Sequence, residues 1–141
     1  MLRANNLFVD TAGWGDYLDR SSSKHLMAVR LIQQAALRRR RLVTTNYIFY
    51  ELVALLSSDR FHFPRQQVIT AINSIKGNDL VEVLHIDQAT DDEAWQLLEN
   101  RLDKEWSLVD ASSFIIMKRY RIIEALTSDH HFEQAGFTKL L

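Results

Sequence analysis

Four acidic residues stand at or near positions where the sequence predicts strand ends and helix starts: Asp10, Glu51, Asp110 and Asp129. Several carboxylates in one crevice repel each other and raise each other's pKa unless a cation neutralises them. Oxygen ligands without cysteine or paired histidine suit Mg²⁺ or Mn²⁺. Such an ion lowers the pKa of bound water and offsets charge on a phosphodiester transition state. If the four acids converge, the predicted chemistry is metal-dependent phosphodiester cleavage.

The segment over residues 107–132 predicts a helix, a strand and a polar turn, and it carries two of the acids. Ser107 is a predicted N-cap with Asp110 three residues on, which is the spacing of a capping box. Residues 122–126 predict a buried strand, and Asp129 lies just past its carboxyl end. In open α/β sheets, ligands bind in the crevice beyond the carboxyl ends of the strands. Asp110 and Asp129 are therefore placed for such a crevice.

The other two acids come from the first half of the chain. Residues 7–9 are a short apolar run that predicts a buried strand, and Asp10 ends it. Residues 42–43 predict a second strand, with Asn46 as the predicted N-cap of an apolar helix after it. Glu51 is the one acid inside that helix. A buried, unpaired carboxylate costs several kcal/mol, so Glu51 must reach water, a cation or a hydrogen-bond donor.

Helix and strand patterns alternate along the rest of the chain. The further predicted elements are an amphipathic helix that starts at Lys24 and closes in the arginines at 38–41, a helix with Pro64 in its first turn, a strand at 80–86, a helix opening on a capping box at 90–93, and an edge strand at 138–141. Such alternation predicts a parallel sheet that is covered on both faces. Right-handed crossovers then bring successive strand ends to one edge of the sheet, where the four acids can converge.

Composition restricts the class of protein further. The 141 residues are 47% hydrophobic and 25% charged, with four glycines and one proline, which predicts one globular domain over residues 1–141. The absence of cysteine excludes disulfides and thiolate metal sites and is compatible with a reducing cytoplasm. We expect no signal peptide, because no sustained apolar stretch precedes Asp10, and no membrane segment, because no apolar run approaches ~20 residues.

The formal net charge of -1 gives no general attraction to nucleic acid, so RNA binding would need a local basic patch. The four consecutive arginines at residues 38–41 could hold phosphates, although such a run is more often a solvated helix end. They are Arg38, Arg39, Arg40 and Arg41.

Each acid also has a structural interpretation. Asp110 could serve only as a capping residue, Asp129 as a plain N-cap and Asp10 as an ordinary turn residue. Asp16 is expected on the solvated face of a short helix. A structural or exposed role is likewise expected for His130 and His131.

Four motifs, in order along the chain, together resemble the PIN-domain ribonucleases, with the VapC-type toxins of bacterial toxin–antitoxin pairs as the nearest likeness. The motifs are FVDT at residues 8–11, TNYIFYEL at 45–52, WSLVDASSF at 106–114 and TSDHHFEQAGF at 127–137. They extend over nearly the whole chain, which makes them more specific together than the pattern of acids alone.

The resemblance implies a three-layer α/β/α sandwich with a central, mainly parallel sheet of four to five strands. It implies that Mg²⁺ or Mn²⁺ is held by Asp10, Glu51, Asp110 and Asp129, with support from Thr11, Asn46, Ser107 and Thr127. It also implies a cytoplasmic protein with an RNA substrate, a cognate antitoxin and frequent homodimerisation.

We interpret the chain as a metal-dependent endoribonuclease, the toxin of a type II toxin–antitoxin system, in which metal-activated water cleaves RNA. Asp10 and Asp110 are the principal metal ligands in this interpretation. Glu51 completes the site or orients the attacking water, and Asp129 tunes or shares a second ion.

Two alternatives stay open. One is a catalytically silent PIN-like module that binds RNA or protein through an intact acidic pocket. The other is an aspartate-based phosphotransfer protein, a class that usually pairs acids beside the first strand and places a lysine after a later one. Here Asp10 is followed by Thr11.

Overall fold

A computed structural model describes residues 5–141 of the chain. The strands in these residues are β1 (Leu7–Val9), β2 (Leu42–Thr45), β3 (Val81–Leu84), β4 (Glu124–Leu126) and β5 (Thr138–Lys139). The helices are α1 (Thr11–Leu18), α2 (His25–Leu37), α3 (Asn46–Ser57), α4 (Arg65–Lys76), α5 (Gln88–Asn100), α6 (Leu108–Arg119) and α7 (His131–Gln134). None of these helices is both long enough and apolar enough to cross a membrane.

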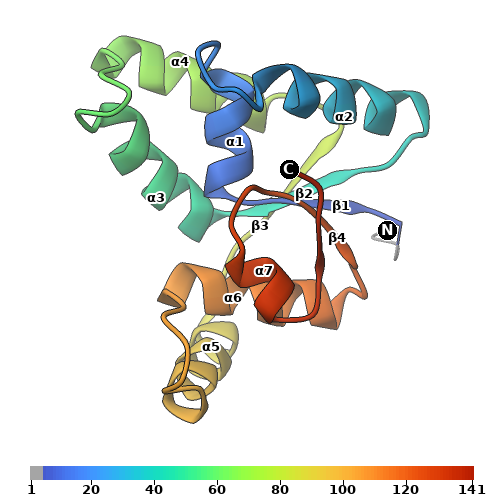
Figure 1. Ribbon diagram of the computed structural model, residues 1–141, viewed down its shortest axis with the longest axis vertical. Coiled ribbons are helices and arrows are strands. Elements are labelled where there is room, and N and C mark those ends of the chain that lie inside the picture. The colour runs from blue at the N-terminus through green and yellow to red at the C-terminus, as the bar shows by residue number, and fades with distance from the viewer. Residues whose placement is uncertain (1–4) are drawn as a thin grey trace.

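The five strands form one parallel sheet in the order β3-β2-β1-β4-β5. Figure 1 shows α1 to α4 on one side of this sheet and α5 to α7 on the other. The predicted three-layer α/β/α sandwich is therefore confirmed, including the edge strand near the C-terminus. Because parallel strands carry all their carboxyl ends at one edge, the residues that follow β1, β2 and β4 meet there.

The central strand has no solvent-exposed face. All three residues of β1 are buried, with exposures of 1% or less. A strand covered by helices on both faces reads as a continuous apolar run instead of an alternating one, which is why LFV in the sequence predicted it. Phe8 packs its ring against Phe132 of α7, with centroids 6.3 Å apart. The core thus connects the first strand to the last helix.

The carboxyl ends of β1 and β2 are joined by buried side chains of α1 and β2. Trp14 donates its indole N–H to Thr44 Oγ1 at 3.1 Å, and the Thr44 hydroxyl donates to the Val9 carbonyl at 2.9 Å. Trp14 is itself 1% exposed. These hydrogen bonds satisfy polar groups that would be costly to bury unpaired, and they hold the start of α1 against the sheet.

Two predicted helix starts are wrong. Thr45, in extended backbone, is the N-cap of α3 and accepts from the Ile48 N–H at 3.2 Å, whereas Asn46 is the first helical residue. Asn46 Oδ1 instead accepts the Ile86 N–H at 2.7 Å and fixes α3 to the segment after β3. The predicted cap at residues 90–93 lies inside α5, because Asp87 caps that helix from an extended backbone conformation.

The prediction that the amphipathic helix closes in the arginine run is wrong, because α2 ends at Leu37. Arg40 pairs with Glu124 at 2.7 Å, and Arg41 pairs with Glu82 at 2.8 Å. Both arginines precede β2, and Glu124 begins β4. These ion pairs therefore lie towards the amino-terminal edge of the sheet, opposite the edge where Asp10 and Asp129 follow their strands.

Close approach of α1 to β4 requires a glycine at position 13. A Cβ placed on Gly13 would lie 2.0 Å from the Leu126 carbonyl oxygen, which is a backbone atom and cannot rotate away. Alanine is the better residue for a helix interior by about 1 kcal/mol, yet the steric clash here exceeds that preference. We expect Gly13→Ala to lower the free energy of unfolding by roughly 2–4 kcal/mol.

Urea denaturation in EDTA measures this loss. Gly15→Ala is the matched control, because a Cβ at that position meets side-chain atoms and no backbone atom, namely the tip of Leu55 at 3.3 Å and Phe61 Cζ at 3.5 Å. If Gly13→Ala were as stable as Gly15→Ala, the close packing of α1 on β4 would be contradicted.

Candidate active site

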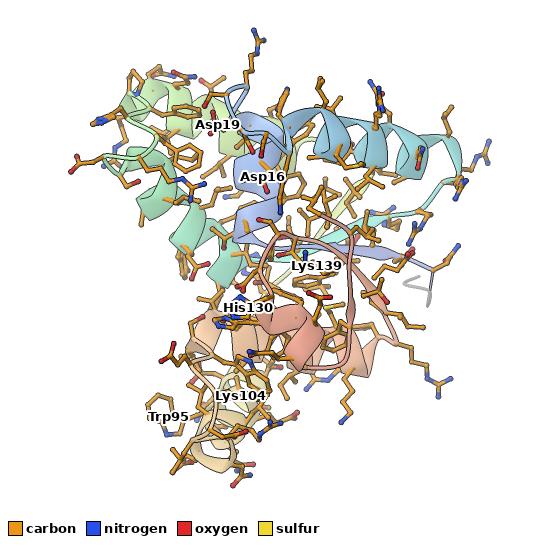
Figure 2. All side chains as sticks on the ribbon, in the orientation of Figure 1. Asp16, Asp19, Trp95, Lys104, His130 and Lys139 are labelled. Carbon is orange, nitrogen blue, oxygen red and sulfur yellow. The ribbon has the colours of Figure 1, made fainter. Side chains whose placement is uncertain are left out.

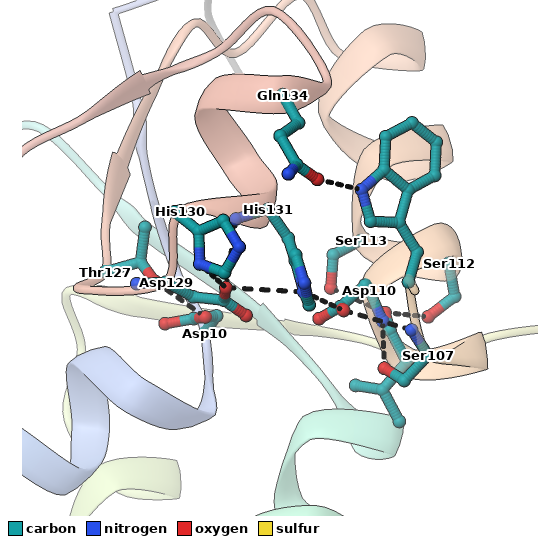
Figure 3. Close-up of polar contacts among 12 residues, drawn as sticks. Asp10, Ser107, Asp110, Ser112, Ser113, Thr127, Asp129, His130, His131 and Gln134 are labelled. Carbon is teal, nitrogen blue, oxygen red and sulfur yellow. Dashed lines mark hydrogen bonds and ion pairs between the residues drawn. The ribbon is translucent and has the colours of Figure 1, made fainter. Parts of the chain in front are cut away.

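Three of the four acids predicted from the sequence, Asp10, Asp110 and Asp129, come together at the carboxyl-terminal edge of the sheet (Figure 3). Asp10 follows β1, Asp129 follows β4, and Asp110 lies in the first turn of α6. Glu51 approaches from α3, and it lines a cavity of about 270 Å³ together with Asp10 and Asp129. The charges of Asp110 and Asp129 raise the pKa of both Asp10 and Glu51, as expected for neighbouring carboxylates.

Asp10 is the most deeply placed of the acids. It is the N-cap of α1, where Oδ1 accepts the Gly13 N–H at 2.9 Å, and Oδ2 accepts the Thr127 hydroxyl at 2.8 Å. Only 6% of the residue is exposed. Burial raises the pKa of Asp10 to about 8, and the charges of Asp129 and Asp110 add to this against the lowering effect of the two hydrogen bonds. The ionised form is thus destabilised in the absence of a cation.

Asp110 is both a helix cap and a member of the acidic group. Ser107 Oγ accepts the Asp110 N–H at 3.0 Å, and Asp110 Oδ2 accepts the Ser107 N–H at 3.1 Å, which confirms the predicted capping box. Burial raises the pKa of Asp110, and so does the charge of Asp129. A carboxylate has two oxygens with room for several donors, so capping leaves Asp110 able to bind a further partner.

Glu51 is half-buried on α3. Burial is the largest cause that raises its pKa, and the nearby Thr11 hydroxyl lowers it. Thr11 Oγ1 is nevertheless buried with no partner in hydrogen-bonding geometry among the described residues. Thr11 lines the same cavity, so its hydroxyl is a polar group without a partner beside the carboxylates.

Sequence reasoning assigned no role at the site to His131. Its Nδ1 lies 3.0 Å from Asp110 Oδ2 and 3.3 Å from Asp129 Oδ1, so it bridges two acids that are far apart in the sequence. The Asp129 carboxylate also accepts the His131 N–H at 3.0 Å. His130 Nδ1 lies 3.8 Å from Asp129 Oδ1, and 70% of the His130 side chain is exposed, in agreement with expectation. The only sequence signal for His131 was its place two residues after Asp129.

The four residues predicted to support the acids are differently placed. Thr127 bonds Asp10 and also accepts the Asp129 N–H at 2.9 Å, and Ser107 bonds Asp110. Thr11 lines the cavity, whereas Asn46 bonds Ile86 and lies outside the cavity lining. The structure therefore places three of the four beside the acids and the fourth at the start of α3.

Asp16 is a further acid beside the cavity, and its predicted place on a solvated helix face is wrong. It lies on α1 (Figure 2) and is 8% exposed. Its Oδ1 accepts the Ser22 hydroxyl at 2.8 Å, whereas Oδ2 is buried with no partner among the described residues. Asp16 also lines the cavity that contains Asp10 and Glu51. The turn after α1 folds back on it, which the helical pattern alone could not reveal.

Aromatic residues behind the site fix the two helices that carry its residues. Phe114 of α6 packs edge-to-face against Phe132 of α7 at 5.0 Å and against Trp106 at 5.1 Å. The Trp106 indole N–H donates to Gln134 Oε1 at 3.0 Å. This cluster holds α6 and α7 together, and it thereby sets the distance between Asp110 and the Asp129 turn.

The donor set fits a hard divalent cation. Carboxylates come from Asp10, Glu51, Asp110 and Asp129, and the first three have raised pKa values because they are buried beside like charges. Mg²⁺ and Mn²⁺ prefer such oxygen ligands. Among the described residues, a second possible group of ligands is formed by Asp129, His130 and His131.

A family model, curated relatives and a solved structure all indicate the same kind of protein. The chain matches the PIN domain family over residues 7–138. It is 29% identical over 134 residues to the 23S rRNA-specific endonuclease VapC20 of two Mycobacterium tuberculosis strains, which covers 95% of this chain and 97% of the relative. The crystal structure of M. tuberculosis VapC20, described as a sarcin–ricin loop-cleaving toxin, aligns with a TM-score of 0.81 and 28% identity over 94% of this chain and 97% of that one.

The raised pKa of Asp10 predicts that the metal-free protein loses stability as the pH rises. Between the unfolded value of 3.8 and the folded value of about 8, the folded protein retains a proton that the unfolded chain releases. The free energy of unfolding therefore falls with increasing pH through this window. We expect Asp10→Asn to flatten this dependence and to exceed the wild type in stability at about pH 8 by roughly 1–3 kcal/mol.

Urea denaturation across this pH range, in EDTA, provides the measurement. Asp92→Asn is the control, because Asp92 is an exposed acid on α5 outside the cavity lining. An Asp10→Asn protein that kept the full pH dependence of the wild type would contradict the assignment of that dependence to Asp10.

Proposed function

The chain belongs to the PIN-domain family, and from that premise we propose that it is a metal-dependent endoribonuclease of the VapC toxin type. The resemblance indicated by the four sequence motifs is confirmed by the family match. The observation that carries the proposal is the convergence of four acids: Asp10, Glu51 and Asp129 line one cavity, and His131 joins Asp110 to Asp129. Family membership also argues against the phosphotransfer interpretation.

We propose that Asp10 and Asp110 are the principal ligands of Mg²⁺ or Mn²⁺, with Glu51 and Asp129 completing the site. When bound, such an ion lowers the pKa of water and offsets charge that develops on the phosphodiester. Thr127 and the Gly13 N–H orient the Asp10 carboxylate.

As the alternative to binding the ion directly, Glu51 has the properties of a general base for the attacking water. It is half-buried, its pKa is raised, and it shares the cavity with Asp10, which brings it nearer to the range in which a carboxylate accepts protons efficiently. The water oxygen forms a bond to phosphorus, its proton passes to Glu51, and the bond from phosphorus to a ribose oxygen breaks. His131 holds Asp110 and Asp129 in fixed positions.

The similar proteins also suggest a substrate. VapC20 is named as a 23S rRNA-specific endonuclease, and its structure is described as that of a sarcin–ricin loop-cleaving toxin. We therefore propose the sarcin–ricin loop of 23S rRNA as the first substrate to test. We also propose that the protein is a single domain over residues 1–141, that it is a homodimer in the cytoplasm, and that it binds a cognate antitoxin.

Substitution of the principal ligands tests the site. We expect Asp10→Asn and Asp110→Asn each to lower kcat/KM for RNA cleavage by at least about 100-fold, because each removes a negative ligand of the cation. Cleavage of a synthetic sarcin–ricin loop hairpin is followed on gels, circular dichroism verifies folding, and Asp92→Asn is the control. Undiminished cleavage by folded variants would refute the ligand assignment.

Binding of the cation should depend on pH, because protons compete with it for Asp10. We expect the apparent affinity for Mn²⁺ to rise as the pH increases towards about 8, the pKa of Asp10. Thermal shift on addition of Mn²⁺ measures this, and the shift should be strongly reduced in Asp10→Asn. Mn²⁺ binding without cleavage of any RNA would favour the catalytically silent binding module, and cleavage unchanged by EDTA would contradict metal dependence.

A further inference from the structure

The geometry points to Arg60 as the side chain through which the active-site cavity binds a backbone phosphate of its RNA substrate. The inference rests on the proposed ribonuclease function and deepens it. Arg60 lies in the turn after α3 and lines the same cavity as Asp10, Glu51 and Asp129. It is the only cation in that lining among the described residues. The cavity therefore has carboxylates and a guanidinium within one opening.

The turn that carries Arg60 is held by backbone hydrogen bonds. The N–H groups of Phe61 and His62 both donate to the Ser58 carbonyl, at 3.1 and 2.8 Å, and the Phe63 N–H donates to the Leu56 carbonyl at 3.0 Å. His62 adopts a φ of 54°, which closes the turn. Arg60 is therefore fixed relative to α3, the helix that carries Glu51.

Phe61 provides a surface on which the guanidinium rests. The Arg60 Cζ lies 5.2 Å from the centroid of the Phe61 ring, and that ring packs edge-to-face against Phe63 at 5.9 Å. A Cβ on Gly15 would lie only 3.5 Å from Phe61 Cζ, so the ring also reaches the surface of α1. A cation–π contact orients an arginine without neutralising its charge, and the N–H groups at the guanidinium edge stay available.

Arg60 differs from the arginines that stabilise the fold. Arg40, Arg41 and Arg119 each pair with a glutamate at 2.7–3.1 Å. Arg60 is exposed and has no ion pair in the part of the chain that the structure describes, although acids line the same cavity. An unpaired, oriented guanidinium beside a catalytic cavity has the geometry to bind a phosphate with two hydrogen bonds.

The acidic lining of the cavity favours such a group. With four acids in its lining (Asp10, Asp16, Glu51 and Asp129), the cavity repels a phosphodiester. A bound divalent cation offsets only part of this charge, and the arginine run before β2 lies at the other edge of the sheet. Arg60 supplies positive charge on the side of the cavity formed by the turn after α3. The competing explanation is that Arg60 only balances the charge of the neighbouring acids.

Arg60→Ala and Arg60→Lys separate these explanations. The probe is a synthetic sarcin–ricin loop hairpin, with cleavage kinetics in Mn²⁺ and binding measured by fluorescence anisotropy in Ca²⁺. A contact to a non-reacting phosphate binds ground state and transition state alike. We therefore expect Arg60→Ala to raise KM and Kd by about 5- to 20-fold with kcat within about twofold, and to reduce the slope of log Kd against log salt by about 0.7.

Arg60→Lys keeps the charge but loses the planar pair of donors, so its loss of affinity should be intermediate. Arg30→Ala is the matched control, because Arg30 is exposed on α2, outside the cavity lining, and its removal changes the net charge equally. Circular dichroism and thermal melting verify that the variants fold.

The outcomes separate failure of the Arg60 phosphate contact from failure of the ribonuclease function. If the wild type cleaves the hairpin but Arg60→Ala behaves as Arg30→Ala does, the phosphate contact is wrong and the ribonuclease function stands. The same holds if Arg60→Ala tightens Mn²⁺ binding and leaves Kd for RNA unchanged, since Arg60 then only balances charge. If Kd depends on Arg60 but nothing is cleaved, the contact stands and the proposed activity fails. A wild type that neither binds nor cleaves the hairpin overturns both.

Discussion

The hydrogen bond from the Thr127 hydroxyl to Asp10 Oδ2 joins the ends of the two central strands, and the geometry of the site depends on it. Thr127 follows β4 and Asp10 follows β1, and these strands pair in parallel with Val9 opposite Leu126. The register alone brings the two residues to one edge. The hydrogen bond then selects the orientation of the carboxylate, and Gly13 allows α1 to start close enough to β4 for this contact to form.

The same arrangement brings carboxylates close enough to repel one another, and packing elsewhere in the fold offsets the cost of that repulsion. Asp10, Glu51 and Asp110 have pKa values raised chiefly by burial. Such a group of acids destabilises the folded state unless protons or a cation neutralise it. The packing that opposes this cost lies directly behind the site, where Trp106, Phe114 and Phe132 form an edge-to-face cluster. Stability from packing thus maintains a site whose own charges oppose folding, as expected for functional sites.

The sequence was most informative where structure depends on local pattern. The apolar runs identified the short strands, the Ser107–Asp110 spacing identified a capping box, and strand alternation identified the sheet edge where the acids meet. It failed where a residue's partner is distant in the chain or depends on a turn. Asn46 bonds Ile86 across 40 positions, and His131 reaches Asp110 across 21. Neither contact has a periodic signature, so only the tertiary arrangement reveals it.

Arginines at the two edges of the sheet have different partners, in a protein of formal net charge -1 that is proposed to bind RNA. At the amino-terminal edge, Arg40 and Arg41 are consumed by ion pairs that join neighbouring strands. At the carboxyl-terminal edge, acids predominate and Arg60 is held on an aromatic ring instead of a carboxylate. A paired arginine has lost donors that a phosphate would need, whereas one oriented by a ring keeps them. Affinity for RNA would then depend on the cavity, because the chain as a whole, with a formal net charge of -1, has no general attraction to nucleic acid.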